Sequence, residues 1–376
     1  MNFRNTVFRL GSPCADNYGF LVLKSKGIIF GYESENEKFW DFDEESVYFT
    51  AADGRVTSRY RHYGPENIWI GHHERSLYPM YLMPVLSYSP NLAKRHMPPL
   101  LINSVPKSGT HFAQQIAMEL GFQSGATMLT WERNVDDFQY EGRADIDDER
   151  PGARGKICPL DVAVAAIPNG TVVLSHAVNP VWIGAQGVSG LSVIHCIRDL
   201  RDVLISLYRW KIKKGDSANI PAMSIDTYLQ EEAGSDIELL RQSAANIIAH
   251  GHDNVIRYEE LMKRKPSGKL VDTLMRVTNA TKSKVEQAIA TARNKPAATF
   301  TAHHSDFRKV WTDGLQTYFE ESGLEALNLQ LGYSALSSNL KNKLFSSPLA
   351  DPVSDLTRPV KRRNSRSGRE ANPEQD

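Results

Sequence analysis

The sequence is poor in the features that mark several classes of protein. Its 376 residues contain only three cysteines, Cys14, Cys158 and Cys196, which are too few and too far apart for a disulfide framework or a zinc cluster. No apolar run approaches the roughly 20 residues that a membrane helix needs, and the first residues lack the apolar segment of a signal peptide. We therefore expect a soluble, cytoplasmic protein with buried free thiols and no integral membrane segment.

The chain also lacks a net charge and an obvious metal site. Lysine and arginine together number 44, and so do aspartate and glutamate. No overall field therefore favours nucleic acid as a partner. The adjacent pairs His72-His73 and His303-His304 point to opposite sides of a strand, so neither pair is suited to one ion. We expect no bound metal, and any basic binding site must be local.

The residue pattern divides the chain into three parts. From 19 to 85, short aromatic and β-branched runs alternate with turn signals, which predicts a small antiparallel β module. We assign residues 1–97 to this module and its linker. Residues 98–336 alternate apolar strands with helical stretches, which predicts a parallel sheet flanked by helices. Residues 337–376 are rich in serine, proline and charge, and this composition predicts a disordered tail.

The second part predicts four strands, at 100–105, 171–175, 191–197 and 254–258. Its helical stretches fall near 112–120, 201–213, 236–250 and 282–292. The carboxyl ends of parallel strands meet at one edge of their sheet, and such sheets bind ligands there. The residues that follow each strand are therefore the candidates for functional groups.

The first strand leads directly into a loop that is suited to a phosphate group. Residues 106–111 read Pro-Lys-Ser-Gly-Thr-His and open a helix, which places backbone N–H groups and the positive end of the helix together. Gly109 allows a close backbone approach, Lys107 adds a positive charge, and Ser108 and Thr110 add hydroxyl donors. The lysine precedes the glycine, so the order of a Walker A loop is absent.

A second anion site is indicated after the strand at 191–197. Arg198 ends this strand, and Ser206 follows eight residues later within a helical segment. An arginine fork and a serine hydroxyl two helical turns apart can converge on one anion.

These two segments resemble the sulfotransferases that use 3′-phosphoadenosine 5′-phosphosulfate (PAPS). The loop is similar to the family's Pro-Lys-Ser-Gly-Thr-Thr-Trp sequence, with His111 and Phe112 at its last two positions. Arg198, residues 201–203 and Ser206 match the family's 3′-phosphate motif. The resemblance implies that residues 107–112 hold the 5′-phosphosulfate, with Phe112 against the adenine, and that Arg198 and Ser206 hold the 3′-phosphate.

Two later segments extend the resemblance to about residues 100–320. Residues 307–319, FRKVWTDGLQTYF, are similar to the family's C-terminal loop, although Val310 replaces a glycine. The resemblance implies that Arg308 and Lys309 bind the 3′-phosphate. The segment VIRYEELMK is similar to a strand and turn in which the tyrosine, here Tyr258, lies near the adenine.

The candidate catalytic base is His176, which ends the strand TVVLSH. Histidine suits proton transfer near neutral pH, and the family's base lies in a similar strand that reads Lys-Thr-His. Leu174 replaces that lysine, and the arginines that could supply the missing charge are Arg133, Arg143 and Arg154. Our hypothesis is that His176 takes the acceptor proton while Lys107 stabilises the departing 5′-phosphate oxygen.

The sequence therefore predicts a sulfotransferase that moves a sulfuryl group from PAPS to a hydroxyl, releases PAP and requires no metal. The aromatic β module and the insert 123–170 could both shape an acceptor site. A glycan is favoured over another small-molecule acceptor, because the CH groups of sugars pack on aromatic ring faces. One alternative is an ATP-dependent kinase of the P-loop type, in which Asp199 would bind magnesium. Another is a protein that binds PAP or PAPS without catalysis. The sequence does not indicate an oligomeric state.

Overall fold

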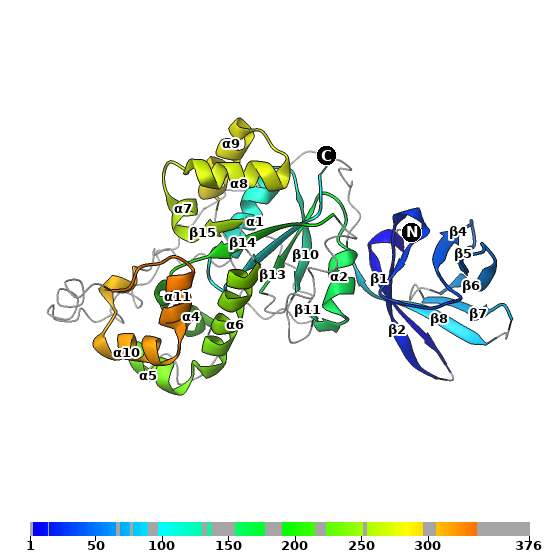
Figure 1. Ribbon diagram of the computed structural model, residues 1–376, viewed down its shortest axis with the longest axis horizontal. Helices are drawn as coiled ribbons and strands as arrows, with labels where there is room; N and C mark the ends of the chain where they lie inside the picture. Colours follow the sequence, from blue (N-terminus) through cyan, green and yellow to red (C-terminus); the bar gives the residue numbers. More distant parts are fainter. Residues whose placement is uncertain are drawn as a thin grey trace, which may run out of the picture.

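The computed structural model describes residues 3–13, 15–64, 68–75, 78–88, 97–129, 134–136, 155–176, 190–214, 223–250, 254–295 and 306–336. These residues form an antiparallel β module followed by a parallel sheet flanked by helices (Figure 1). The predicted fold class is confirmed. The predicted tail at 337–376, as well as Cys14, His303-His304 and the three arginines of the insert, lies outside the described residues.

The module is one curved sheet of eight strands in the order β3-β2-β1-β8-β7-β6-β5-β4. The strands are β1 (Thr6–Ser12), β2 (Ala15–Leu23), β3 (Ile29–Phe30), β4 (Phe39–Phe42), β5 (Ser46–Thr50), β6 (Val56–Tyr63), β7 (Ile68–His73) and β8 (Pro79–Ser87). A bridge between Ile28 and Phe39 brings the two edges together, so the sheet nearly closes on itself. Its first strand, β1, precedes residue 19, where the aromatic and β-branched pattern of the sequence begins.

Large side chains fill the inside of the curved sheet. Phe8, Trp40, Phe49 and Tyr60 are all buried in one apolar cluster, and the rings of Phe49 and Tyr60 lie 5.1 Å apart between centroids. Strand alternation explains this arrangement, because every second residue of a strand points to the same face. Most of the module's aromatic residues therefore serve as core.

The second unit contains a seven-stranded sheet in the order β12-β11-β10-β13-β9-β14-β15. Its strands are β9 (Leu100–Ser104), β10 (Gln123–Leu129), β11 (Asn134–Asp136), β12 (Gly155–Ile157), β13 (Thr171–Ser175), β14 (Ser192–Ile197) and β15 (Val255–Arg257). Strands β10, β13, β9, β14 and β15 are parallel, whereas β11 and β12 pair in the antiparallel sense. All four predicted strands are confirmed. The central β9 and β13 are buried at every position, which explains their continuous apolar runs.

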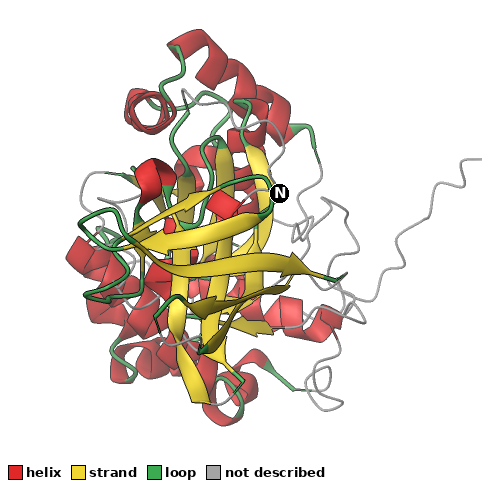
Figure 2. Ribbon diagram, turned by 90° about the vertical axis from the view of Figure 1, so that its right-hand side faces the viewer, coloured by secondary structure: helices red, strands yellow, loops and turns green. Residues whose placement is uncertain are grey.

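Helices cover both faces of this sheet (Figures 1 and 2). They are α1 (Thr110–Glu119), α2 (Leu160–Ala165), α4 (Leu200–Lys214), α5 (Ile225–Glu231), α6 (Gly234–His250), α7 (Tyr258–Met262), α8 (Gly268–Thr278), α9 (Lys282–Arg293), α10 (Asp313–Glu321) and α11 (Leu324–Gln330). Helices α1, α8 and α9 share one apolar cluster with the sheet, and α4, α5, α6, α10 and α11 form another. No helix in the described residues combines the length and apolar character needed to cross a membrane.

The two units share an apolar core at α2. Val7, Val22 and Leu86 from the outer face of the module pack in one cluster with residues of α2 and of the parallel sheet. Tyr88, just after β8, is buried and donates a hydrogen bond from its hydroxyl to the carbonyl of Ala163 at 3.0 Å. The chain that follows the module is therefore anchored at Tyr88, within the segment predicted as a linker.

Candidate functional site

The predicted site residues follow the carboxyl ends of neighbouring parallel strands. β9 lies between β13 and β14, with Asn103 paired to both Ser175 and His195. β15 pairs with β14 on its other side. The phosphate loop after β9, His176 after β13, Arg198 after β14 and Tyr258 after β15 consequently reach the same edge of the sheet.

The loop after β9 adopts a conformation that requires glycine. Its backbone turns through two left-handed residues, with φ of 62° at Lys107 and 90° at Gly109. The amide of Ser108 donates to the carbonyl of Val105 at 3.2 Å and closes the turn. A Cβ at Gly109 would lie 2.7 Å from the ring of Tyr258. The glycine is therefore required both by its φ angle and by the aromatic ring that packs on it.

The two hydroxyls of this loop differ in their partners. Thr110 is bound internally, because its hydroxyl lies 2.6 Å from that of Ser104. Ser108 is fully buried, and its hydroxyl has no hydrogen-bond partner within the described residues. A buried hydroxyl without a partner costs about 1–3 kcal/mol. An acceptor on a ligand would remove that cost, so Ser108 is the hydroxyl best placed to bind one.

His176 is held in one tautomer by the end of β9. Its Nδ1 lies 2.9 Å from the carbonyl oxygen of Ser104, which can only accept a hydrogen bond. Nδ1 therefore carries the proton, and Nε2 holds the lone pair. Burial lowers the pKa of His176 to about 4; the bond to Ser104 raises the pKa, and the nearby charge of Lys107 lowers it. The imidazole is consequently neutral at pH 7 and able to accept a proton at Nε2.

Lys107 lies between His176 and helix α4. Its ammonium nitrogen lies 4.0 Å from the ring centroid of Trp210, a cation–π contact. Its carbonyl accepts a long hydrogen bond of 3.5 Å from Nη1 of Arg198. The charge of Lys107 also acts on His176. The structure therefore brings the predicted base and the predicted lysine close together.

Arg198 and one face of α4 form a second cationic region. The guanidinium of Arg198 is buried and lies 4.3 Å above the ring of Tyr258. Asp202, Ser206 and Arg209 are spaced four and three residues apart, so they lie on one face of α4. Arg198 interacts electrostatically with both Asp202 and Arg209. That face of the helix is therefore directed toward Arg198, and binding of the 3′-phosphate by Arg198 and Ser206 stays a prediction.

The C-terminal loop reaches this region through Asp202. The amide of Phe307 donates to Oδ1 of Asp202 at 2.7 Å. Burial raises the pKa of Asp202 to about 7, although the charge of Arg198 and the Phe307 hydrogen bond lower it. Arg308 and Lys309 are both exposed, and Arg308 pairs with Asp306 at 3.2 Å. Asp202 therefore links this loop to Arg198. Phosphate binding by Arg308 and Lys309 stays a prediction.

The two remaining loop residues lie on the first turn of α1. His111 is half-buried, and Phe112 is half-buried against the apolar cluster of α1, α8 and α9. Part of the Phe112 ring thus serves as core, and its predicted contact with adenine stays a prediction.

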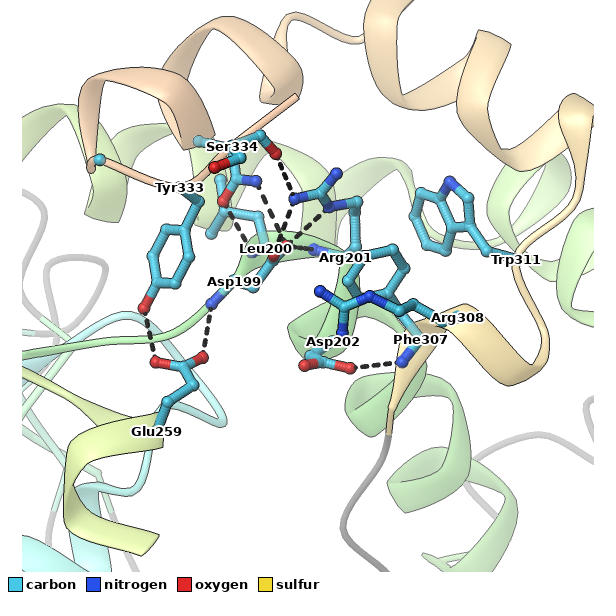
Figure 3. A network of polar contacts seen from close by, with 12 residues as sticks. Asp199, Leu200, Arg201, Asp202, Glu259, Phe307, Arg308, Trp311, Tyr333 and Ser334 are labelled. Carbon is cyan, nitrogen blue, oxygen red and sulfur yellow. Dashed lines mark hydrogen bonds and ion pairs between the residues drawn. The ribbon is translucent and has the colours of Figure 1, made fainter. Parts of the chain in front are cut away.

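Asp199 is fully engaged by protein donors (Figure 3). Nε and Nη2 of Arg201 donate to its two carboxylate oxygens at 2.8 and 2.7 Å. Asn328 donates to Oδ1 as well, at 3.2 Å. A carboxylate held in this way is poorly placed to bind magnesium, which weighs against the kinase alternative. Within the described part of the chain, no group of three or more His, Cys, Asp or Glu residues could hold a metal ion.

Several residues of this region were missed from the sequence. Ser104 orients His176, while Trp210 and Arg209 flank the cationic region. A helical-wheel analysis of α4 would have found Arg209, because it lies on the same face as Ser206. No sequence signal marks Ser104, since its contact with His176 spans 72 positions. The buried free thiols expected at Cys158 and Cys196 are confirmed.

Comparisons with known proteins give a limited result. No family model matches the sequence, and no curated protein matches it. Among solved structures, the fold is similar to that of mouse sulfotransferase SULT7A1 complexed with PAP, with 14% sequence identity and a TM-score of 0.38. The match covers 63% of this chain and 89% of that chain. The likeness concerns the fold alone, and we base each site assignment on the geometry of this chain's own residues.

Proposed function

We propose that the protein is a sulfotransferase that uses PAPS as donor. One observation carries this proposal: a neutral histidine, whose Nε2 holds the lone pair, and a lysine lie together beside a phosphate-type loop at the carboxyl edge of a parallel sheet. Sulfuryl transfer requires a base for the incoming hydroxyl and positive charge at the leaving oxygen. His176 and Lys107 supply these two groups.

The donor would be held at two points along the same edge. The loop amides and the unpartnered hydroxyl of Ser108 fit the 5′-phosphosulfate. Arg198 and Ser206, with Arg209 beside them, fit the 3′-phosphate, and Tyr258 provides a ring next to both points. Three cations in this region, Lys107, Arg198 and Arg209, match an anionic donor without a metal ion.

The proposed reaction is an in-line displacement at sulfur. Nε2 of His176 takes the proton of the acceptor hydroxyl as its oxygen forms the new bond to sulfur. The bond between sulfur and the 5′-phosphate oxygen breaks, and the phosphate leaves with the electron pair. Lys107 stabilises that oxygen. An anion bound beside Lys107 also offsets the effect of its charge on His176, which raises the pKa of the imidazole and makes it a stronger base.

The acceptor is proposed to be a hydroxyl of a carbohydrate. The exposed aromatic residues of the module include Phe39 at 45%, Phe42 at 50% and Tyr63 at 68%. Ring faces of this kind pack against the CH groups of sugars. Strands β4 and β6, which carry them, lie at the end of the module farthest from the parallel sheet (Figure 1). These rings would therefore bind sugar units of an extended glycan that lie far from its reacting hydroxyl.

The decisive test is thermal stabilisation by PAP, ADP, and ATP with magnesium at equal concentrations. A ligand that binds only the folded state raises the melting temperature by mass action. We expect PAP to stabilise the protein without metal, and more strongly than ADP, because only PAP carries the 3′-phosphate. Stabilisation by ATP with magnesium but not by PAP would favour the kinase alternative.

A Ser108→Ala variant tests the loop in the same assay. We expect weaker stabilisation by PAP but an unchanged or higher melting temperature without ligand, because the substitution removes a buried hydroxyl that lacks a partner. A lower ligand-free melting temperature with unchanged PAP binding would contradict the assignment of Ser108. Transfer from labelled PAPS to a panel of glycans then separates an enzyme from a protein that binds PAP without turnover.

A further inference from the structure

A cavity of about 400 Å³ lies beside the turn between β14 and α4. Its lining includes Arg201, Arg257, Arg308 and the segment 332–336 that follows α11. Among the described residues that line it, neither Arg198 nor any member of the phosphate loop is included. The cavity therefore lies apart from the phosphate loop and Arg198, and it shares with the donor assignments only Arg308, whose binding of the 3′-phosphate stays a prediction.

Arg201 reaches this cavity with one donor unused. The residue is 2% exposed, and Nη2 donates to Asp199 at 2.7 Å and to the carbonyl of Ser334 at 2.8 Å. Nη1 has no hydrogen-bond partner within the described residues, and Figure 3 shows it without a dashed line. A buried guanidinium N–H without a partner is costly. An acceptor in the cavity would satisfy it.

Arg257 enters the cavity from the end of β15. Its Nη2 donates to the carbonyls of Leu331 and Gly332 at 3.1 and 3.0 Å, and its guanidinium lies 4.7 Å from the ring of Tyr333. Gly332 has a φ of 82°, and a Cβ there would come within 2.4 Å of Nη2. Glycine at this position therefore allows the arginine to lie against the backbone of the segment.

Arg308 completes the cluster from the C-terminal loop. The guanidiniums of Arg201 and Arg308 lie 4.4 and 4.8 Å from the ring of Phe307 (Figure 3). The cavity lining thus contains three guanidiniums and a single carboxylate, that of Asp199, which is already paired with Arg201. The excess positive charge favours an anion.

Three carboxylates adjoin the cavity without lining it: Glu259, Asp306, and Asp202, which accepts from the amide of the lining residue Phe307 at 2.7 Å. Glu259 accepts from the hydroxyl of Tyr333 at 2.9 Å and from the amide of Asp199 at 3.2 Å. Asp306 accepts from Arg308 in an ion pair with both side chains about half exposed. Such an exposed pair is weak, so it leaves Arg308 able to bind a stronger anion.

We propose that this cavity binds a phosphate or sulfate monoester of a small molecule. Arginine forks match tetrahedral oxyanions in both charge and geometry, and the buried Nη1 of Arg201 provides a fixed donor. The volume lies within the range of small-molecule sites, so it exceeds the space that the oxyanion itself needs. The rings of Phe307 and Tyr333 offer faces for the organic part of the ester.

Isothermal titration of the full chain with glucose 6-phosphate tests the proposal, with glucose as the uncharged control. We expect glucose 6-phosphate to bind, glucose not to bind, and saturating PAP to leave the binding in place. Arg257→Gln should weaken the affinity for glucose 6-phosphate by about tenfold, as expected for the loss of a charge-assisted hydrogen bond. The same variant should leave the affinity for PAP within about twofold, because Arg257 is not part of the proposed donor site.

The matched control is Arg241→Gln, an exposed arginine on α6, which should change neither affinity. If Arg257→Gln does not fold, Arg257→Lys replaces it, because lysine keeps the positive charge and removes the guanidinium fork that matches an oxyanion. Displacement of glucose 6-phosphate by PAP, with no effect of the arginine variant, would place the anion in the donor site and overturn the proposal. Absence of binding at millimolar concentrations would overturn it as well.

Discussion

The interior of the β module and the carboxyl edge of the parallel sheet bury their side chains for different reasons. The module encloses mainly apolar groups, and Phe49 and Tyr60 pack ring against ring. The sheet edge buries the hydroxyl of Ser108, which has no hydrogen-bond partner within the described residues. Burial of apolar surface stabilises a fold, whereas burial of a polar group without a partner destabilises it. The interior of the module therefore contributes stability, whereas the buried hydroxyl at the sheet edge reduces it.

The largest expected effect is that of His176→Ala on catalysis. Loss of a general base costs about 10²–10⁴-fold in rate, so kcat for sulfuryl transfer should fall within that range. Affinity for PAP should stay within about twofold, because the histidine is assigned to the acceptor proton and not to the donor. Initial rates with labelled PAPS and a PAP titration measure the two quantities.

His72→Ala, in strand β7 of the module, is the matched control and should leave kcat unchanged. Retained turnover in His176→Ala would show that another group takes the proton. An equal fall in both variants would show that histidine loss acts through the fold as a whole.

The next effect is on stability and belongs to the module. Phe49 is fully buried, so Phe49→Ala should lower the free energy of unfolding by about 3–5 kcal/mol. Affinity of the folded protein for PAP should not change, because the cluster around Phe49 contains no residue of the sheet edge. Urea denaturation and a PAP titration below the melting temperature check both parts.

Phe42→Ala is the control for this comparison, since Phe42 is 50% exposed and its loss should cost less than about 1 kcal/mol. Equal losses at the two positions would contradict the view that the filled interior stabilises the module.

The sequence predicted the strands correctly where burial on both faces gave a continuous apolar run. Strands β9 and β13 are buried on both faces, and their apolar runs predicted them. Strand β10, with the sequence QSGATML, was missed because its small and polar residues give no such run. Strand β1 was missed as well, since an arginine and a glycine interrupt TVFRLGS. Both strands form through pairing with neighbours, which a local pattern does not reveal.

The sequence predicted which residues meet at the candidate site, but it did not predict how those residues contact one another. Parallel topology brings the loop, His176 and Arg198 to one edge, and the strand pattern predicted this arrangement. The tautomer of His176 depends on a carbonyl 72 positions away, at Ser104. The role of Asp199 was open from the sequence, because only the folded turn shows that Arg201 occupies both of its oxygens. Such contacts are properties of the assembled structure.

The smallest expected effect concerns Asp202, which lies between the cationic region and the C-terminal loop. Burial raises its pKa in the folded state from 3.8 to about 7. Between these values the folded protein keeps a proton that the unfolded chain has released. This carboxyl therefore stabilises the fold at low pH, and its contribution declines as the pH rises toward 7. Asp202→Asn should remove that slope while its amide oxygen still accepts from Phe307.

The measurement is the free energy of unfolding of both proteins at pH 5, 6, 7 and 8, without ligand. His176 contributes a slope of the opposite sign, because its lowered pKa makes the fold more stable as the pH rises from about 4 toward 6.5. Only the difference in the free energy of unfolding between variant and parent isolates the effect of Asp202. This difference should grow in favour of the variant as the pH rises to 7, and it should change little above pH 7. The exposed Asp272→Asn on α8 is the control and should show a constant difference. A constant difference for Asp202→Asn would mean that this carboxyl is already ionised at pH 5, and that Arg198 and the Phe307 amide outweigh its burial.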